Sequence, residues 1–185
     1  MVVNFLFILF CFLLDGIIIV LFPNSFLPSQ MVFVPCLGLS SLVLTNRHLS
    51  KIDSVLLAAC FGLFYDFFVA RTFLTYTVIF VITIIIARLW SNHMMESLIE
   101  CLLLAISTIF VKEFSIYLLM YIRNLTQMDV MTWVMNRLFL TLLINGILVV
   151  VIVFASRVIQ DYILLREKRI RKEESLSWLD LLSKR

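Results

Sequence analysis

The chain has 185 residues, 63% of them hydrophobic, and a mean hydropathy of +1.09. Only 15% of its residues are charged, and the formal net charge is +3. A soluble domain of this size and composition would expose too apolar a surface to remain in solution, so these values predict an integral membrane protein. The length suits an all-α bundle of transmembrane helices and leaves no room for a second large domain.

The first apolar run, Val2 to Leu21, has the length of one membrane-spanning helix. It lacks a basic stretch at its start and a small-residue cleavage site, and Asp15 interrupts its apolar character. These features are atypical of a cleaved signal peptide. We therefore expect a retained transmembrane helix.

The second apolar run, Met31 to Leu44, is the weakest, because it is short for a span and contains Pro35. A run of this length is also typical of a partial or re-entrant segment. If the segment begins at Leu27, it reaches spanning length but includes Pro28, Ser29 and Gln30. Both interpretations remain open, and we favour a full span.

The next apolar stretch, Val55 to Ala87, contains only two charged residues, Asp66 and Arg71. One span needs about 20 residues, so this stretch predicts two helices joined by a tight turn. We expect them at about Val55–Phe68 and Phe73–Leu89. Asp66 then lies near the end of the first of these helices.

Two further apolar runs, Leu98 to Tyr121 and about Met131 to Phe154, bring the expected number of spans to six. We expect residues 1–158 to form the membrane domain and residues 159–185 a cytoplasmic tail. Basic residues favour the cytoplasmic side. With the tail inside, four basic residues lie on the outer side, Arg71, Lys112, Arg123 and Arg137, against eleven on the inner side: Arg47, Lys51, Arg88, Arg157, Arg166, Lys168, Arg169, Arg171, Lys172, Lys184 and Arg185. The C-terminus is therefore expected inside. With six spans the N-terminus is also inside, which we favour; if the second run does not span, only the first helix reverses its direction.

Several polar residues fall within the predicted helices, where charged groups are costly. On this topology they share one depth, just below the outer surface: Asp15, Asp66, Lys112, Glu113, Asn136 and Arg137. Either each side chain reaches the nearby interface by itself, or together they form a polar cluster or an outward-facing recess. Lys112 and Glu113 are adjacent and should point about 100° apart, so we do not expect them to face the same neighbour. Asn145, beside Gly146, predicts a helix–helix hydrogen bond.

The tail begins with a basic stretch whose members are Arg166, Lys168, Arg169, Arg171 and Lys172. Next to a membrane span, such a stretch is typical of contact with anionic lipid and gives no indication of nucleic-acid binding. Ser175 could then cap a short amphipathic helix carrying Leu176, Trp178, Leu179 and Leu182. We expect this segment to lie on the membrane surface or to dock on a cytoplasmic partner.

The sequence offers no catalytic motif, and we expect neither an enzyme nor a bound cofactor. The four cysteines lie within apolar runs without metal-ligand spacing, so we interpret them as packing residues: Cys11, Cys36, Cys60 and Cys101.

The segment Gly62-Leu63-Phe64-Tyr65-Asp66 closes the third predicted span. In a chain of this length, span count and basic tail, it resembles the rod shape-determining protein MreD family, which carries a Gly-Leu-hydrophobic-Tyr-Asp pattern at this place. The family usually has a glycine shortly after the aspartate. Here the chain continues from Phe67 to Thr75 without one.

The resemblance implies a non-enzymatic membrane scaffold of the bacterial cell-elongation machinery, in the cytoplasmic (inner) membrane. Its expected partners are MreC, the RodA glycosyltransferase with a class B penicillin-binding transpeptidase, and MreB filaments. Gly62, Tyr65 and Asp66 would then serve helix packing. An alternative function is that of the substrate-binding subunit of an energy-coupling-factor vitamin transporter, whose six-helix bundle is similar to MreD. The bulky first helix, with only Gly16 small between Phe5 and Phe22, counts against the transporter.

Overall fold

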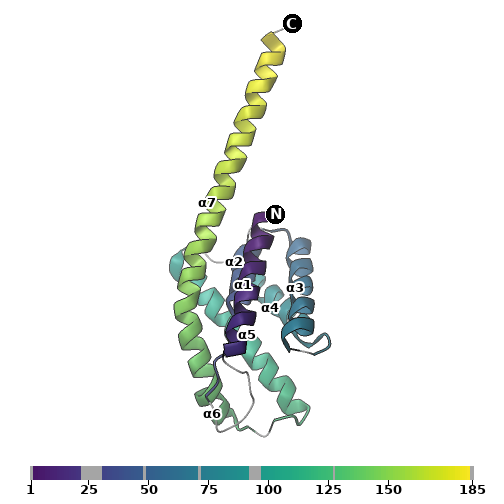
Figure 1. Ribbon diagram of the computed structural model, residues 1–185, viewed down its shortest axis with the longest axis vertical. Helices are drawn as coiled ribbons and strands as arrows, with labels where there is room; N and C mark the ends of the chain where they lie inside the picture. The colour runs from purple at the N-terminus through teal and green to yellow at the C-terminus, as the bar shows by residue number, and fades with distance from the viewer. Residues whose placement is uncertain are drawn as a thin grey trace.

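The described residues of the computed structural model are helical apart from the segments that connect the helices (Figure 1). The structure describes residues 2–21, 31–47, 49–70, 72–91, 97–126 and 128–183. The elements, in chain order, are α1 (Val2–Leu21), α2 (Leu37–Asn46), α3 (Lys51–Tyr65), the π-helical turn η1 (Asp66–Ala70), α4 (Thr75–Ser91), α5 (Leu98–Ile122), α6 (Val130–Trp133), the π-helical turn η2 (Val134–Leu138) and α7 (Phe139–Ser183).

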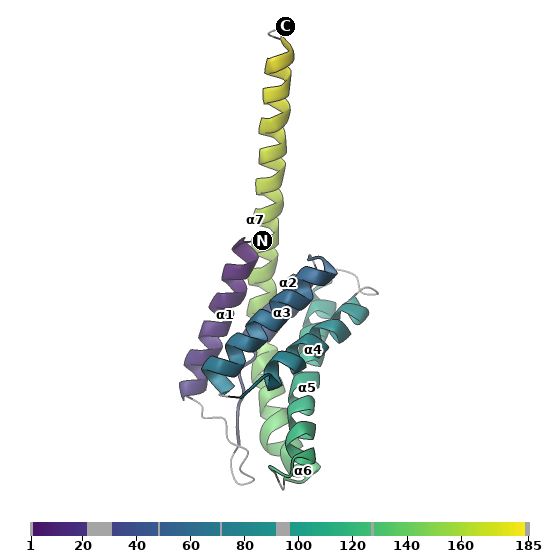
Figure 2. The same ribbon diagram turned by 90° about the vertical axis from the view of Figure 1, so that its right-hand side faces the viewer.

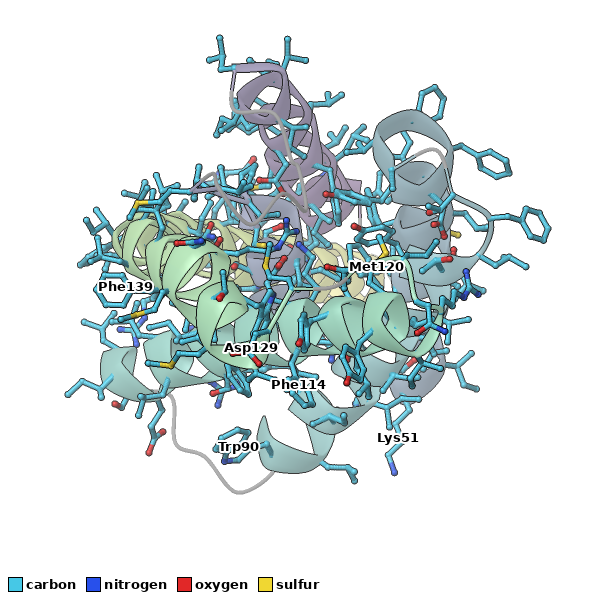
Figure 3. All side chains as sticks on the ribbon, turned by 90° about the horizontal axis from the view of Figure 1, so that it is seen from below. Lys51, Trp90, Phe114, Met120, Asp129 and Phe139 are labelled. Atoms are coloured by element: carbon cyan, nitrogen blue, oxygen red, sulfur yellow. The ribbon has the colours of Figure 1, made fainter. Side chains whose placement is uncertain are left out.

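Within the described part of the chain, four helical stretches are long and apolar enough to cross a membrane: Val3–Leu21, Lys51–Ala70, Leu98–Ile122 and Val130–Lys172. Large apolar side chains such as those of Phe10, Phe139 and Val151 are exposed on the outside of the bundle. Figure 3 shows Phe139 pointing outward from the helix that carries it. An apolar surface of this extent is stable in lipid and unstable in water. The chain is therefore a helical membrane protein.

Helix α2 occupies the centre of the bundle. All ten of its residues are buried, and it packs against α1, α4, α5 and α7. Helices α3 and α4 form a closely packed hairpin beside it (Figure 2). Between them and α1 lies an aromatic core, in which the rings of Phe12 and Phe61 stack 4.9 Å apart and those of Tyr65 and Tyr76 lie 4.7 Å apart.

The expected second transmembrane helix is instead a broken segment. Residues 31–36 are extended, and only Leu37–Asn46 are helical. The extended part runs beside η2 and α7, where the N–H of Val32 donates to the carbonyl of Asn136 over 2.9 Å and that of Cys36 to Asn145 Oδ1 over 3.0 Å. Asn145 Nδ2 donates in return to the carbonyl of Val34 over 2.7 Å. These bonds replace those of a helix and allow non-helical backbone to be buried.

Helix α7 is longer than the sequence predicted. It has 45 residues, a length of about 67 Å at 1.5 Å per residue, and its end extends far beyond the bundle (Figures 1 and 2). The N-terminus of α1 lies on the same side of the bundle as this end. The helix passes Ser175 without a break, so no separate helix begins there. Leu176, Trp178, Leu179 and Leu182 belong to the end of α7, and their side-chain environments lie outside the described part of the structure.

Candidate functional site

Three charged side chains meet in the interior of the bundle, and we call Lys112, Glu113 and Arg137 the ion cluster. Arg137 Nε donates to Glu113 Oε2 over 2.9 Å, and Lys112 Nζ lies 2.9 Å from Glu113 Oε1. None of the three side chains is more than 2% exposed. One carboxylate between two cations is an arrangement that lets charge remain in an apolar interior.

For Lys112 and Arg137 the ion cluster agrees with one of the two interpretations that the sequence left open, a shared polar cluster. Lys112 and Arg137 do not reach toward the membrane surface, because both are buried. Lys112 and Glu113 also contact each other directly, although they are adjacent on α5. Their long side chains bend toward a common point, so the angle between their Cα–Cβ bonds does not keep the charged ends apart.

Asp15 lies near the end of α1 and caps the start of α2. Its two carboxylate oxygens accept hydrogen bonds from the N–H groups of Leu37, over 2.9 Å, and Gly38, over 2.8 Å. A carboxylate at a helix N-terminus satisfies amides that the helix itself leaves without a partner. Lys112 reaches the same region, where its Nζ lies 3.2 Å from Cys36 Sγ and interacts electrostatically with Asp15.

Asp66 does for α4 what Asp15 does for α2. Its carboxylate accepts hydrogen bonds from the backbone N–H groups of Tyr76, over 3.0 Å, and Thr77, over 2.8 Å. The hydroxyls of Thr77 and Thr72 donate to the same carboxylate over 2.7 and 2.5 Å. Asp66 is only 1% exposed. A short acidic side chain near the end of one helix therefore holds the start of the next.

The six polar residues expected at one depth thus divide into two groups. Asp15 and the ion cluster are brought together around the start of α2, whereas Asp66 is engaged separately at the start of α4. Asn136 contributes its backbone carbonyl to the extended segment. Asp66 and Arg137 each lie within a π-helical turn, η1 and η2, and such turns are frequent at functional sites.

Gly62 lies one turn before Asp66, at the closest approach of α3 to α4. A Cβ atom at this position would lie 2.5 Å from the Cα of Thr77 and 3.2 Å from its nitrogen. Only glycine permits this approach, which brings the carboxylate of Asp66 within reach of the α4 amides. The motif residues Gly62 and Asp66 therefore act together on one hairpin.

We expect Gly62→Ala to lower the thermal unfolding temperature of the purified protein, because the added methyl group forces α4 away from α3. Overpacking of this kind costs about 1–3 kcal/mol. Gly16→Ala and Gly146→Ala are matched controls, since nothing lies within 4 Å of a Cβ at either position. Alanine is the better helix former, so both controls should unfold at the native temperature or above it. A Gly62→Ala protein as stable as the controls would contradict this account.

Tyr65, the third motif residue, connects the hairpin to the ion cluster. Its ring is buried, and Lys112 Nζ lies 6.0 Å from the ring centre. Tyr65 and Tyr76 also line a cavity of about 270 Å³, together with Thr72 and Arg123. Asp15 and the ion cluster do not line this cavity. The buried charged side chains thus contact one another and backbone amides.

Sequence reasoning missed several partners of these residues. Thr72 and Thr77 complete the Asp66 site, and Cys36 contacts Lys112. Arg88, which was predicted only as a basic residue of the inner side, binds the loop before α3 through the Leu49 carbonyl and the first turn of α3 through the Ser54 hydroxyl. Polar residues spaced along a helix could have indicated the side chains that hold the extended segment, because Thr141 and Asn145 lie one turn apart.

The basic residues of the tail lie on the projecting part of α7. All five are exposed, and at 100° per residue they point to several sides of the helix: Arg166, Lys168, Arg169, Arg171 and Lys172. Of the four cysteines, Cys11, Cys36 and Cys101 are buried as predicted, whereas Cys60 is exposed; none forms a disulfide.

No protein-family model, curated protein or solved structure matches the chain.

Proposed function

We propose that this protein is a non-enzymatic membrane scaffold of the MreD type, acting in the bacterial cell-elongation machinery. The observation that carries the proposal is the structural use of the Gly62–Asp66 motif. Gly62 permits the close approach of α3 and α4, and Asp66 fixes the start of α4 through two backbone amides. A motif that fixes how two helices pack also fixes the surface that they present to the membrane. A protein that binds other membrane proteins needs such a defined surface.

The use of the other buried polar residues supports the same proposal. Asp15 caps α2, and the ion cluster pairs one carboxylate with two cations. These groups hold helices in place and do not converge on the described cavities. The geometry therefore favours a rigid scaffold over a chemical site.

We further propose six membrane crossings, of which two are atypical. Helix α4 has 17 residues, the lower limit of what can cross the hydrocarbon core. For the second crossing, ten helical residues cover about 15 Å, and the six extended ones about 20 Å. Together they suffice for a core of about 30 Å. The charge bias then assigns the C-terminus to the cytoplasm, in the cytoplasmic membrane of a bacterium.

In this role the protein would bind MreC and join MreB filaments to the wall synthases, RodA and a class B penicillin-binding transpeptidase. The projecting end of α7 supports a cytoplasmic contact, because it carries the basic stretch out of the bundle. A helix that leaves the membrane in this way can present its sides to a protein partner.

The transporter alternative is less well supported. On the side expected to face outward, where a transporter subunit of this kind would take up its substrate, the cavity beside Tyr65 and Tyr76 has about 270 Å³, below the 300–1,000 Å³ that is typical of small-molecule sites. The outer face of α1 exposes Phe5, Phe10 and Ile17 and offers no stripe of small residues to a partner helix. We therefore retain the scaffold as the proposed function.

Depletion of the protein from its source bacterium tests the proposed function. We expect rod-shaped growth to be lost, with wider or rounded cells and fewer sites of labelled wall insertion along the side wall. Cells that keep their width and insertion pattern after depletion, but lose uptake of a vitamin, would refute the scaffold and favour the transporter.

Removing residues 175–185 is expected to weaken binding of a cytoplasmic partner without unfolding the bundle. The reason is that residues 175–183 belong to the projecting end of α7, which lies far from the packed core (Figure 1). Co-purification with and without the segment measures the binding, and thermal unfolding reports on the bundle. Full binding by the truncated chain would show that this end of α7 is not a docking element.

A further inference from the structure

A second cavity lies where α2, α5 and α7 meet, at the end of the bundle from which α7 projects. It has a volume of about 460 Å³ and is lined by Leu44, Arg47, Cys101, Val153, Ser156, Arg157, Gln160, Asp161 and Leu164. We call it the arginine crevice. Its apolar lining comes from all three helices, and its polar lining comes from Arg47 at the end of α2 and from α7. A molecule bound there must satisfy both.

The apolar part of the arginine crevice forms its floor. Leu44, Cys101 and Val153 are buried there, one from each of the three helices. Arg47 is joined to this floor, since its Nη1 lies 3.2 Å from Cys101 Sγ. A guanidinium held against apolar side chains is favourable for binding an anion, because little water competes for its donors.

The walls of the arginine crevice continue into the apolar outside of the bundle. Leu164 on α7 lines the crevice and is 54% exposed. Such surfaces are covered by lipid chains in a membrane protein. A ligand that enters from the bilayer therefore meets cationic groups and apolar surface together.

The charges of the arginine crevice define the headgroup that fits it. Arg47 and Arg157 supply two positive charges and Asp161 one negative charge, which leaves a net charge of one. One phosphodiester neutralises this charge, and the Ser156 hydroxyl and the Gln160 amide supply neutral hydrogen-bonding groups beside it. Basic pockets between transmembrane helices at the cytoplasmic side bind lipid headgroups of this kind.

We propose that the arginine crevice binds one anionic phospholipid with a single phosphodiester, of the phosphatidylglycerol class. The phosphate lies between Arg47 and Arg157, and the acyl chains follow the apolar faces of α5 and α7. This proposal does not depend on which proteins the chain binds.

Thermal unfolding of the full chain in detergent micelles, titrated with phosphatidylglycerol, tests the proposal. We expect this lipid to stabilise the native protein, whereas phosphatidylcholine does not. Arg47→Gln and Arg157→Gln should each weaken the apparent lipid affinity about tenfold, because each removes a charge-assisted contact. Arg169→Gln is the matched control, since it makes the same charge change at an exposed position of α7 outside the crevice, and its affinity should equal the native one.

Native mass spectrometry of the same proteins counts bound lipids directly and keeps the test valid if a variant is unstable in the unfolding assay. The proposal predicts one retained phosphatidylglycerol in the native and Arg169→Gln proteins and its loss in the Arg157→Gln protein. Equal retention by all variants would overturn it. Stabilisation by inorganic phosphate that equals that by the lipid would also overturn it, because the crevice would then hold a free phosphate.

Discussion

Replacing Glu113 with alanine is expected to abolish accumulation of folded protein. Glu113 is fully buried, and its carboxylate contacts both Lys112 and Arg137. Its loss leaves two cations facing each other in the membrane interior. Removing one partner of a buried ion pair costs about 3–5 kcal/mol, which is a large part of the stability of a small bundle. The yield of monodisperse protein after detergent extraction, and its thermal unfolding temperature, measure the effect.

The control for this experiment removes all three charges together. A triple variant, Lys112→Met, Glu113→Leu and Arg137→Met, replaces the ion cluster with apolar groups of similar length. Replacing a complete buried ion cluster in this way is often neutral or stabilising. The triple variant should therefore be more stable than Glu113→Ala, although it carries more changes. Two results would contradict this account: equal loss of folded protein in both variants, or a Glu113→Ala protein as stable as the native one. Either would show that charge compensation in the ion cluster does not stabilise the fold.

Asp66→Ala is expected to destabilise the α3–α4 hairpin and to weaken binding of the partner. The change leaves the buried N–H groups of Tyr76 and Thr77 without their acceptor. Each unsatisfied buried donor costs about 1–3 kcal/mol, so with two such donors we expect a loss of about 2–6 kcal/mol in the free energy of unfolding. Unfolding of the purified variant and its co-purification with MreC report on the two effects.

Two variants on the same turn separate the capping role of Asp66 from a general sensitivity of this region. Asp66→Asn keeps one carbonyl oxygen as an acceptor and should lose less stability than Asp66→Ala. Phe67→Ala removes a larger side chain that is 63% exposed and should leave the fold intact. Unchanged complex formation and cell shape with Asp66→Ala would refute the role assigned to the motif.

The sequence predicted the regular helices well. The apolar run Val2 to Leu21 is α1, and Leu98 to Tyr121 is α5 with one further residue. In these segments the apolar side chains face lipid or core on all sides, so composition alone determines that a helix forms. Asp66 was likewise expected near the end of the third apolar helix, where η1 begins.

The structure around the start of α2 could not be predicted, because it depends on contacts between distant segments. Residues 31–36 stay extended since Asn136, Thr141 and Asn145 supply partners for their backbone, more than 100 positions along the chain. Asp15 bonds α2 across 22 residues. Local patterns do not record such contacts, and the apolar composition of the segment suited a helix equally well.

The two aspartates, Asp15 and Asp66, cap helices in the same way, which neither their spacing nor the composition of the chain indicated. In α1 followed by α2, and again in α3 followed by α4, an aspartate near the end of the first helix binds two successive amides at the start of the second. In both hairpins a glycine permits close packing: Gly38 beneath the ring of Phe12, and Gly62 against Thr77. The connections within the α1–α2 and α3–α4 pairs differ in length. The two pairs therefore share this capping geometry without a visible sequence repeat.

The proposed scaffold function is tested most directly by affinity purification of the tagged full-length protein from gently solubilised membranes of its source bacterium, with identification of the co-purified proteins by mass spectrometry. We predict recovery of MreC together with RodA and a class B penicillin-binding transpeptidase, and a reduced yield of all three with Asp66→Ala. Recovery of a pair of ATPases with a transmembrane coupling subunit, in the absence of MreC, would contradict the scaffold and identify the protein as part of an uptake system.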